Sequence, residues 1–342
     1  MKLGLVYDCC VPNSFYVKDN VSYDFVNNEP YTHHHSASPS CPVGGWNFPF
    51  LWGDGCFLNL HEWIQKGLDF PDYELDIILY ANQRVGLDDE NYYNYGVERL
   101  KKKYPNAKII GWVKEVELSI HKREERTKNW PRFFRDCDDI AAHAVENMKE
   151  IVEYKQLESL IGKKFNFLPP GPINIDLFYD MFYSNEKELS IYAYLPNPIH
   201  RRGDTYEFAD YIGKKYNIPV RYKPLNENQE FYHLSGKDFI KLWSTSLFHF
   251  NLDSSIKQPG IQGIQVANAG SINIGGNNES HHILFPETAT CDKKILEEKF
   301  VEYLEDENKR FQVIEYAWNK LNELYSFNTV KSQVKELYEK NR

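Results

Sequence analysis

The 342-residue sequence is informative first in what it lacks. No apolar run approaches the roughly 20 residues of a membrane-spanning helix. The first residues, "MKLGLVYD", indicate a strand with an acidic end and not a charged leader followed by an apolar stretch. The six cysteines form no C-x-x-C pair. These absences predict a cytoplasmic protein with free thiols, in a reducing compartment.

Positive charge is also scarce. The chain carries 40 Lys and Arg against 49 Asp and Glu, a net charge of −9, and no arm or helix holds a dense basic block. We therefore expect no bulk nucleic-acid binding, although a local basic pocket for a phosphate stays open. The run "HHH" at 33–35 lies in a polar segment, and adjacent residues of an extended chain face opposite ways. No metal site is predicted there.

The composition and the order of apolar and helical segments predict a globular α/β protein. Hydrophobic residues make up 42% and aromatic residues 15%, and aromatic rings either fill cores or contact sugars. The length favours two domains. Short apolar runs that alternate with helical patterns predict parallel strands. In the first half these runs are 3–7, 75–81, 107–113, 139–144 and 164–169. Residues 11–55 predict a long loop over the carboxyl edge of the sheet.

The alternation restarts after a turn-rich segment at 169–188 and ends in a helical tail from about 294. We expect a Rossmann-like domain at 1–180, a second at 181–325, and a last helix at 326–342. That helix carries Val330, Val334 and Leu337 at helical spacing, so it must pack on another surface. Two doubly wound domains followed by such a tail resemble the GT-B fold, in which the last helix crosses back to the first domain and a cleft separates the domains.

One stretch makes the resemblance more specific. The run "KQPGIQGIQVANAGSINI", residues 257–274, is similar to the donor-binding segment of glycogen-synthase-like glycosyltransferases of the GT-B fold. Gly260 and Gly270 fall on the glycines of that segment. Lys257 and Gln265 stand where the family has two glutamates, which is a departure from its pattern. The resemblance implies that this segment holds a nucleotide sugar, with small residues allowing close approach of the backbone.

A second run, "YLPNPIHRRGD", resembles the family's diphosphate-binding turn. Arg202 falls on its lysine, whereas Asn197 occupies its arginine position, and Arg201 or His200 could substitute for that arginine. Guanidinium groups suit phosphate oxygens because they present several donors in one plane. A third, looser match joins 137–178 to the end of the family's first domain and its linker.

The expected function is transfer of a sugar from a nucleotide-diphosphate sugar, most simply a UDP-sugar, to an unknown hydroxyl. Arg201 and Arg202, with Lys257, would stabilise the leaving diphosphate. Gln265 and Glu279 would orient the donor. Glu115 and Asp54 are the two candidates for the base that removes the proton of the acceptor hydroxyl. No cofactor and no metal site is predicted, because the D-x-D string at 136–138 precedes a strand. A GT-B epimerase and a non-catalytic binding protein are the alternatives, and oligomeric state and stereochemical outcome stay open.

Overall fold

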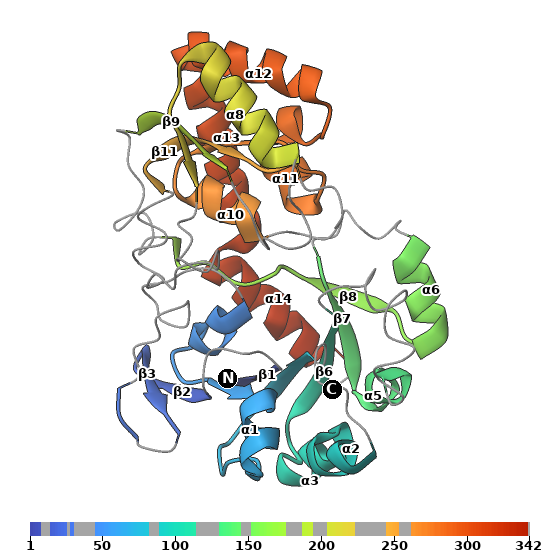
Figure 1. Ribbon diagram of the computed structural model, residues 1–342. Coiled ribbons are helices and arrows are strands. Elements are labelled where there is room, and N and C mark those ends of the chain that lie inside the picture. Colours follow the sequence, from blue (N-terminus) through green and yellow to red (C-terminus); the bar gives the residue numbers. More distant parts are fainter. Residues whose placement is uncertain are drawn as a thin grey trace. The chain divides into compact units, whose positions relative to one another are not determined.

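The computed structural model of this chain describes residues 1–7, 14–25, 28–30, 45–81, 89–113, 130–144, 152–175, 187–193, 204–222, 244–252 and 261–340. Two compact units divide the chain. Unit 1 comprises Met1–Ile173 and Phe327–Arg342, and unit 2 comprises Asn174–Ser326. Each unit is built on its own largely or wholly parallel sheet (Figure 1).

Unit 1 holds an eight-stranded sheet in the order β3-β2-β4-β1-β5-β6-β7-β8. Its strands are β1 (Leu3–Tyr7), β2 (Phe15–Lys18), β3 (Val21–Asp24), β4 (Cys56–Asn59), β5 (Ile77–Ala81), β6 (Lys108–Val113), β7 (Asp139–His143) and β8 (Phe165–Leu168). The six strands from β4 to β8 in this order are parallel, and the β2–β3 hairpin is antiparallel. Strands such as β1 and β5 are apolar and buried throughout, as expected when both faces of a parallel sheet are covered.

The helices of unit 1 cover both faces of this sheet. They are η1 (Gly45–Phe50), α1 (Leu60–Lys66), α2 (Asp89–Tyr95), α3 (Val97–Lys103), α5 (Trp130–Asp136), α6 (Val152–Ile161) and α14 (Phe327–Glu339). One apolar cluster joins α1, α2, α3, α5 and α6 to the sheet. A second cluster joins η1 and α14 to it. This arrangement is a doubly wound sheet.

The terminal helix α14 belongs to unit 1, although α13 before it belongs to unit 2. Val330, Val334 and Leu337 are buried in the second cluster, which confirms the packing predicted from their spacing. Figure 1 shows α14 beside β8. The ammonium group of Lys108, at the start of β6, donates to the carbonyls of Leu337 and Lys340 and so satisfies the C-terminal end of the helix.

Two local predictions for unit 1 are wrong. Residues 11–55 are not one long loop, because 15–24 contain the β2–β3 hairpin, which extends the sheet beyond β4. The strands predicted for the first half also lack β4 (Cys56–Asn59), which directly precedes α1 at Leu60. Asn59 ends the strand and caps α1, and its side chain accepts from the backbone N–H of His61. A four-residue buried strand is too short to show a period of its own.

Unit 2 holds a four-stranded parallel sheet in the order β10-β9-β11-β12. Its elements are β9 (Glu188–Ala193), α8 (Asp204–Tyr216), β10 (Val220–Tyr222), β11 (Ser246–Phe250), α10 (Ile261–Asn268), β12 (Ile272–Ile274), α11 (Glu279–Leu284), η3 (Pro286–Thr288), α12 (Lys293–Glu305) and α13 (Glu307–Tyr325). The helical tail expected from about residue 294 is divided at Asp306 into α12 and α13 before α14 begins. The Asp306 carboxylate accepts from the backbone N–H of Lys309 and starts α13.

Candidate functional site

The carboxyl edge of the unit 2 sheet is the candidate site. Its strand order places β9 and β11 side by side, with β10 outside β9 and β12 outside β11. The chain therefore leaves β9 in one direction and β11 in the other, which makes the gap between them the topological switch point. Open parallel sheets bind ligands outside the carboxyl ends of the strands at that point.

The turn after β12 has a backbone that only glycine adopts easily. Gly275 and Gly276 have φ angles of 94° and 93°. A Cβ atom on Gly276 would lie 1.8 Å from Nδ1 of His281, and one on Gly275 would lie 2.6 Å from the carbonyl oxygen of Asn251. The sequence "GG" is thus required by the close packing of Gly275 against the Asn251 backbone and of Gly276 against His281.

A chain of buried amides and one imidazole holds this edge together. Nδ2 of Asn251 donates to Oε1 of Gln262 at 3.0 Å, and Nε2 of Gln262 donates to Oδ1 of Asn273 at 2.9 Å. Nδ2 of Asn273 donates to the Gly275 carbonyl at 2.7 Å. Nε2 of His281 lies 3.0 Å from Oε1 of Gln262. Because that oxygen is an acceptor, the His281 Nε2 carries the proton.

This network links three elements at one point. Asn251 follows β11, Gln262 lies in the first turn of α10, and Asn273 lies in β12. All three side chains are buried, and buried polar groups are costly unless they are hydrogen-bonded. The network therefore fixes the start of α10 and the Gly275–Gly276 turn relative to the ends of the strands.

The start of α11 is also buried. Asn278 caps the helix by accepting from the backbone N–H of His281 at 3.1 Å. Glu279, predicted to orient the donor, is the first residue of α11 and is only 2% exposed. It lies near Tyr325, whose phenol pKa is raised well above its ordinary value by burial and then by the Glu279 carboxylate. The structure thus places Glu279 inside unit 2, next to the Gly275–Gly276 turn in sequence.

Gln265 and Gly270, the other predicted donor residues that the structure describes, occupy different places. Gln265 lies one turn after Gln262 on α10 and is partly exposed, and its amide has no hydrogen-bond partner among the described residues. Gly270 follows the C-terminal end of α10, with a φ angle of 70° and its N–H bonded to the Ala267 carbonyl at 3.1 Å. It leads into the amino end of β12, so the turn geometry itself accounts for the glycine.

The remaining predicted site residues lie outside the described residues. They are Glu115, His200, Arg201, Arg202, Lys257 and Gly260. Their places in the chain are nevertheless defined by the elements around them. Residues 200–202 belong to the connection from β9 to α8, and 257–260 belong to the connection from β11 to α10. These are the two strands that flank the switch point.

In unit 1, the acidic residues singled out in the sequence serve the protein itself. The Asp138 carboxylate accepts from the backbone N–H of Ile109 at 2.8 Å and pairs with Lys101 at 2.7 Å. Asp136 accepts from the hydroxyl of Tyr92. Within the described ranges, no three His, Cys, Asp or Glu side chains are grouped as a metal site would need. No helix in these ranges has the length and apolarity to cross a bilayer.

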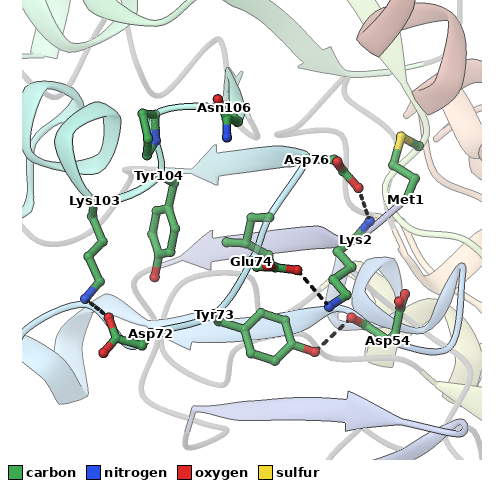
Figure 2. Close-up of a pocket in the computed structure, with 12 residues that line it drawn as sticks. Met1, Lys2, Asp54, Asp72, Tyr73, Glu74, Asp76, Lys103, Tyr104 and Asn106 are labelled. Atoms are coloured by element: carbon green, nitrogen blue, oxygen red, sulfur yellow. Dashed lines mark hydrogen bonds and ion pairs between the residues drawn. The ribbon is translucent and has the colours of Figure 1, made fainter.

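Asp54, the second candidate base, precedes β4 and lies at the amino edge of the unit 1 sheet. It lines a cavity of about 700 Å³ together with Tyr73, Asp76 and Lys103. Figure 2 shows the Tyr73 hydroxyl donating to the Asp54 carbonyl, at 2.9 Å. Because ligands of parallel sheets bind at the opposite edge, this position argues against Asp54 as the catalytic base.

Sequence reasoning missed the residues of the buried network and also His143. His143 ends β7 at the carboxyl edge of the unit 1 sheet, with its ring centroid 5.2 Å from that of Trp112. A usable signal was present, since His143 and Asn251 both stand directly at the ends of apolar strands. Gln262 and His281 gave no such signal, because their contacts join distant parts of the chain.

Comparison with known proteins shows which fold these units form. No protein-family model and no curated protein sequence matches the chain. Solved structures match over its full length. An alpha-glucosyltransferase in complex with UDP-glucose and DNA containing an abasic site has a TM-score of 0.58 at 10% identity, covering 99% of this chain and 100% of that chain. The apo structure of OtsA has a TM-score of 0.61 at 8% identity, covering 100% of both chains.

Another alpha-glucosyltransferase structure, in complex with UDP, covers 84% of this chain and 86% of that chain, with a TM-score of 0.56 and 12% identity. These similar structures are glycosyltransferases of the GT-B fold, and the predicted fold class is therefore confirmed. At these identities the likeness establishes the fold, and the activity of this chain has to be argued from its own residues.

Proposed function

We propose that this protein is a glycosyltransferase that takes its sugar from a nucleotide-diphosphate sugar and binds that donor on unit 2. The observation that carries the proposal is the arrangement at the switch point. The connection after β9 contains Arg201 and Arg202, and the connection after β11 contains Lys257. These connections leave adjacent parallel strands at the edge where such sheets bind ligands. Cations there suit a diphosphate.

The described part of the edge supports the same function. The network of Asn251, Gln262, Asn273 and His281 holds α10 and the glycine turn in place before any ligand arrives. Such preorganisation reduces the ordering cost of binding. The first turn of α10 adds backbone N–H groups that favour negative charge. The ligands named in the similar structures, the donor UDP-glucose and the nucleotide UDP, support a UDP-sugar as the donor of this chain.

The chemistry proposed for the chain is electrostatic. Arg201 and Arg202 stabilise the charge that develops on the leaving diphosphate, with Lys257 as a further cation and His200 beside them. Gln265 and Glu279 orient the donor, and Gly260 lets the backbone approach it. Glu115 is the proposed base for the acceptor hydroxyl, in the role that a general base plays in transfer reactions. The reaction is proposed to need no metal ion and to transfer a hexose.

The test begins with nucleotide binding to the whole chain. UDP, GDP, ADP, dTDP and CMP are compared by thermal shift, with and without Mg²⁺. A nucleotide at a hundred times its Kd stabilises by about 2.7 kcal/mol, a clear shift in Tm. We expect UDP to be the only one of the five nucleotides that raises Tm, and to do so without Mg²⁺. Arg202→Ala and Gln265→Ala should weaken UDP binding, whereas Lys214→Ala on the exposed side of α8 should not.

Turnover then separates the catalytic from the non-catalytic function. UDP release from UDP-glucose is followed with candidate acceptors, among them saccharides and a DNA with an HMU base, the kind of DNA named in one similar structure. Release that depends on one acceptor supports the proposal. Tight UDP binding without release under any condition contradicts catalysis, and absence of binding to every nucleotide contradicts the donor site.

A further inference from the structure

Besides the cavity of unit 1 at Asp54, the described residues form a cavity of about 310 Å³ in unit 2, between the segment Leu284–Thr288 and helices α12 and α13. None of Gln265, Gly270 and Glu279, the described residues of the proposed donor site, lines it. Its volume lies at the small end of the range found for ligand pockets. The cavity therefore suits a small ligand of one or two rings, and it is separate from the site proposed for the nucleotide.

Two tyrosines and a glutamine give this cavity its chemistry. Tyr303 is fully buried, and its hydroxyl lies 3.4 Å from Oε2 of Glu287. Tyr316 is 43% exposed and presents ring surface. Gln312 is exposed, and its amide has no hydrogen-bond partner among the described residues. An exposed ring beside a free amide suits a ligand with one apolar face and several hydroxyl groups.

The charges around the cavity cancel. Glu287 pairs with Lys299 at 2.6 Å and with Lys309 at 3.2 Å, and Lys299 also pairs with Glu302 at 2.8 Å. The hydrogen bond from the Lys299 ammonium is the main reason why the Glu287 pKa is lowered, so this carboxylate is charged at neutral pH. Two carboxylates thus face two ammonium groups. A neutral ligand fits this balance, because it leaves no charge without its partner.

The wall of the cavity is also the support of the glycine turn. Thr288 lines the cavity, and its hydroxyl donates to the Asn273 carbonyl at 2.6 Å. Its own carbonyl accepts from the Gly275 N–H at 3.1 Å. A ligand that restrains Thr288 therefore restrains the turn that follows β12. If the ligand of this cavity and the nucleotide at the donor site favour the same arrangement of this segment, each increases the affinity of the protein for the other by the same factor.

We propose that this cavity is a second carbohydrate site, which binds a neutral saccharide ring against Tyr316 with hydrogen bonds to Gln312 and Glu287. Its effect on nucleotide binding rests on the proposed function, whereas saccharide binding by itself does not. The site is thus testable in protein to which no nucleotide has been added.

The experiment measures binding of glucose, N-acetylglucosamine and maltose to the whole chain by saturation-transfer NMR. We expect at least one of them to bind, and Tyr316→Ala to weaken it about tenfold, the upper value for an aromatic contact. Tyr316→Phe keeps the ring and should keep most of the affinity. Gln312→Ala should also weaken binding. Phe311→Ala removes a 63% exposed ring of the same helix that does not line the cavity, and it should change nothing.

Three results would overturn the proposal. The first is that none of the three saccharides binds at their highest soluble concentrations. The second is that Tyr316→Ala binds them as well as the wild-type chain does. The third is that Phe311→Ala is as damaging as Tyr316→Ala. A loss of UDP binding in the donor-site variants, with saccharide binding intact, would concern the donor site alone, so the two proposals fail in different measurements.

Discussion

Both sheets of this protein pack on apolar, aromatic cores, but the described part of unit 2 buries more polar side chains than that of unit 1. In unit 1 the interior is apolar and aromatic, with rings such as Tyr80, Phe133 and Trp112 buried against the sheet. In unit 2 the ends of β11 and β12 are surrounded by buried amides and an imidazole, Asn251, Gln262, Asn273 and His281 among them. Burying polar groups gains little net stability even when they are paired. The contrast agrees with the proposal that this edge of unit 2 binds the donor, whereas the interior of unit 1 is dominated by packing.

The largest effect is expected from breaking the apolar core of unit 1. Phe133 is fully buried, and its ring lies edge-on to Tyr80 with centroids 4.6 Å apart. Phe133→Ala should cost about 3–5 kcal/mol, through lost burial and the cavity left behind. Hydrogen exchange should show faster opening of β5 and α5, and UDP binding by the remaining folded protein should be unchanged. Loss of protection in β11 and β12 instead would contradict separate stabilisation of the two units.

A smaller effect is expected from breaking the polar network of unit 2. Gln262→Leu removes the acceptor of Asn251 and His281 and the donor to Asn273. We expect a loss of about 2–4 kcal/mol, because buried polar groups are left without partners. Gln265→Leu, one turn later on the same helix, is the matched control. It should leave stability within about 0.5 kcal/mol and weaken UDP binding. Equal denaturation midpoints for the two variants would show that the network does not stabilise the unit.

The third effect concerns the amino edge of the unit 2 sheet and depends on pH. Burial lowers the pKa of Lys187 to about 8, while its ammonium donates to the Ser244 carbonyl at 2.6 Å. In the unfolded chain the pKa is near 10.4. The folded state therefore binds fewer protons between these values, so the free energy of unfolding rises as pH increases from about 8 to about 10.5. The gain should be about 2–3 kcal/mol, with the full penalty present below pH 8.

Lys187→Met should remove this rise and raise stability at pH 7. Urea denaturation at several pH values, with Lys214→Met as an exposed control, measures both effects. A rise of the same size in Lys187→Met would assign the pH dependence to other groups.

The smallest change in stability is expected at Asn268, a buried amide of α10 that lies outside the polar network. Asn268 is fully buried, and neither its side-chain oxygen nor its nitrogen has a hydrogen-bond partner among the described residues. An amide of this kind costs free energy that an apolar side chain of similar size does not. Asn268→Leu should therefore stabilise the protein by about 1 kcal/mol, seen as a higher urea midpoint. A destabilisation would mean that Asn268 has a role that its surroundings do not show.

Much of this fold could be predicted from the sequence, and for clear reasons. Buried parallel strands such as 3–7 and 77–81 are continuous apolar runs, and the spacing of Val330, Val334 and Leu337 already required a partner surface. The β2–β3 hairpin was missed because it lies in a segment rich in Pro, Ser, Asn and Gly, and β4 was missed because its apolar residues run directly into those of α1. Short strands are defined by their neighbours in the sheet and not by their own pattern.

The candidate site was harder to predict. The glycines after β12 were visible as a cluster, but the groups they pack against, the Asn251 backbone for Gly275 and the His281 ring for Gly276, are not adjacent in sequence. Gln262 reads as an ordinary helix residue until Asn251 and Asn273 are brought beside it. Such contacts depend on the strand order β9-β11-β12, which no local pattern contains.

The most direct test of the central claim is hydrogen exchange of the whole chain with and without UDP. We predict slower exchange in the β11–α10 connection, in α10 and in the Gly275–Asn278 turn. The amino edge of the same sheet, at Lys187 and Ser244, should exchange as before, because the ligand sits at the carboxyl ends of the strands. UDP-dependent protection confined to the amino edge or to unit 1, or no protection in unit 2 at saturating UDP, would contradict the assignment of unit 2 as the donor-binding unit.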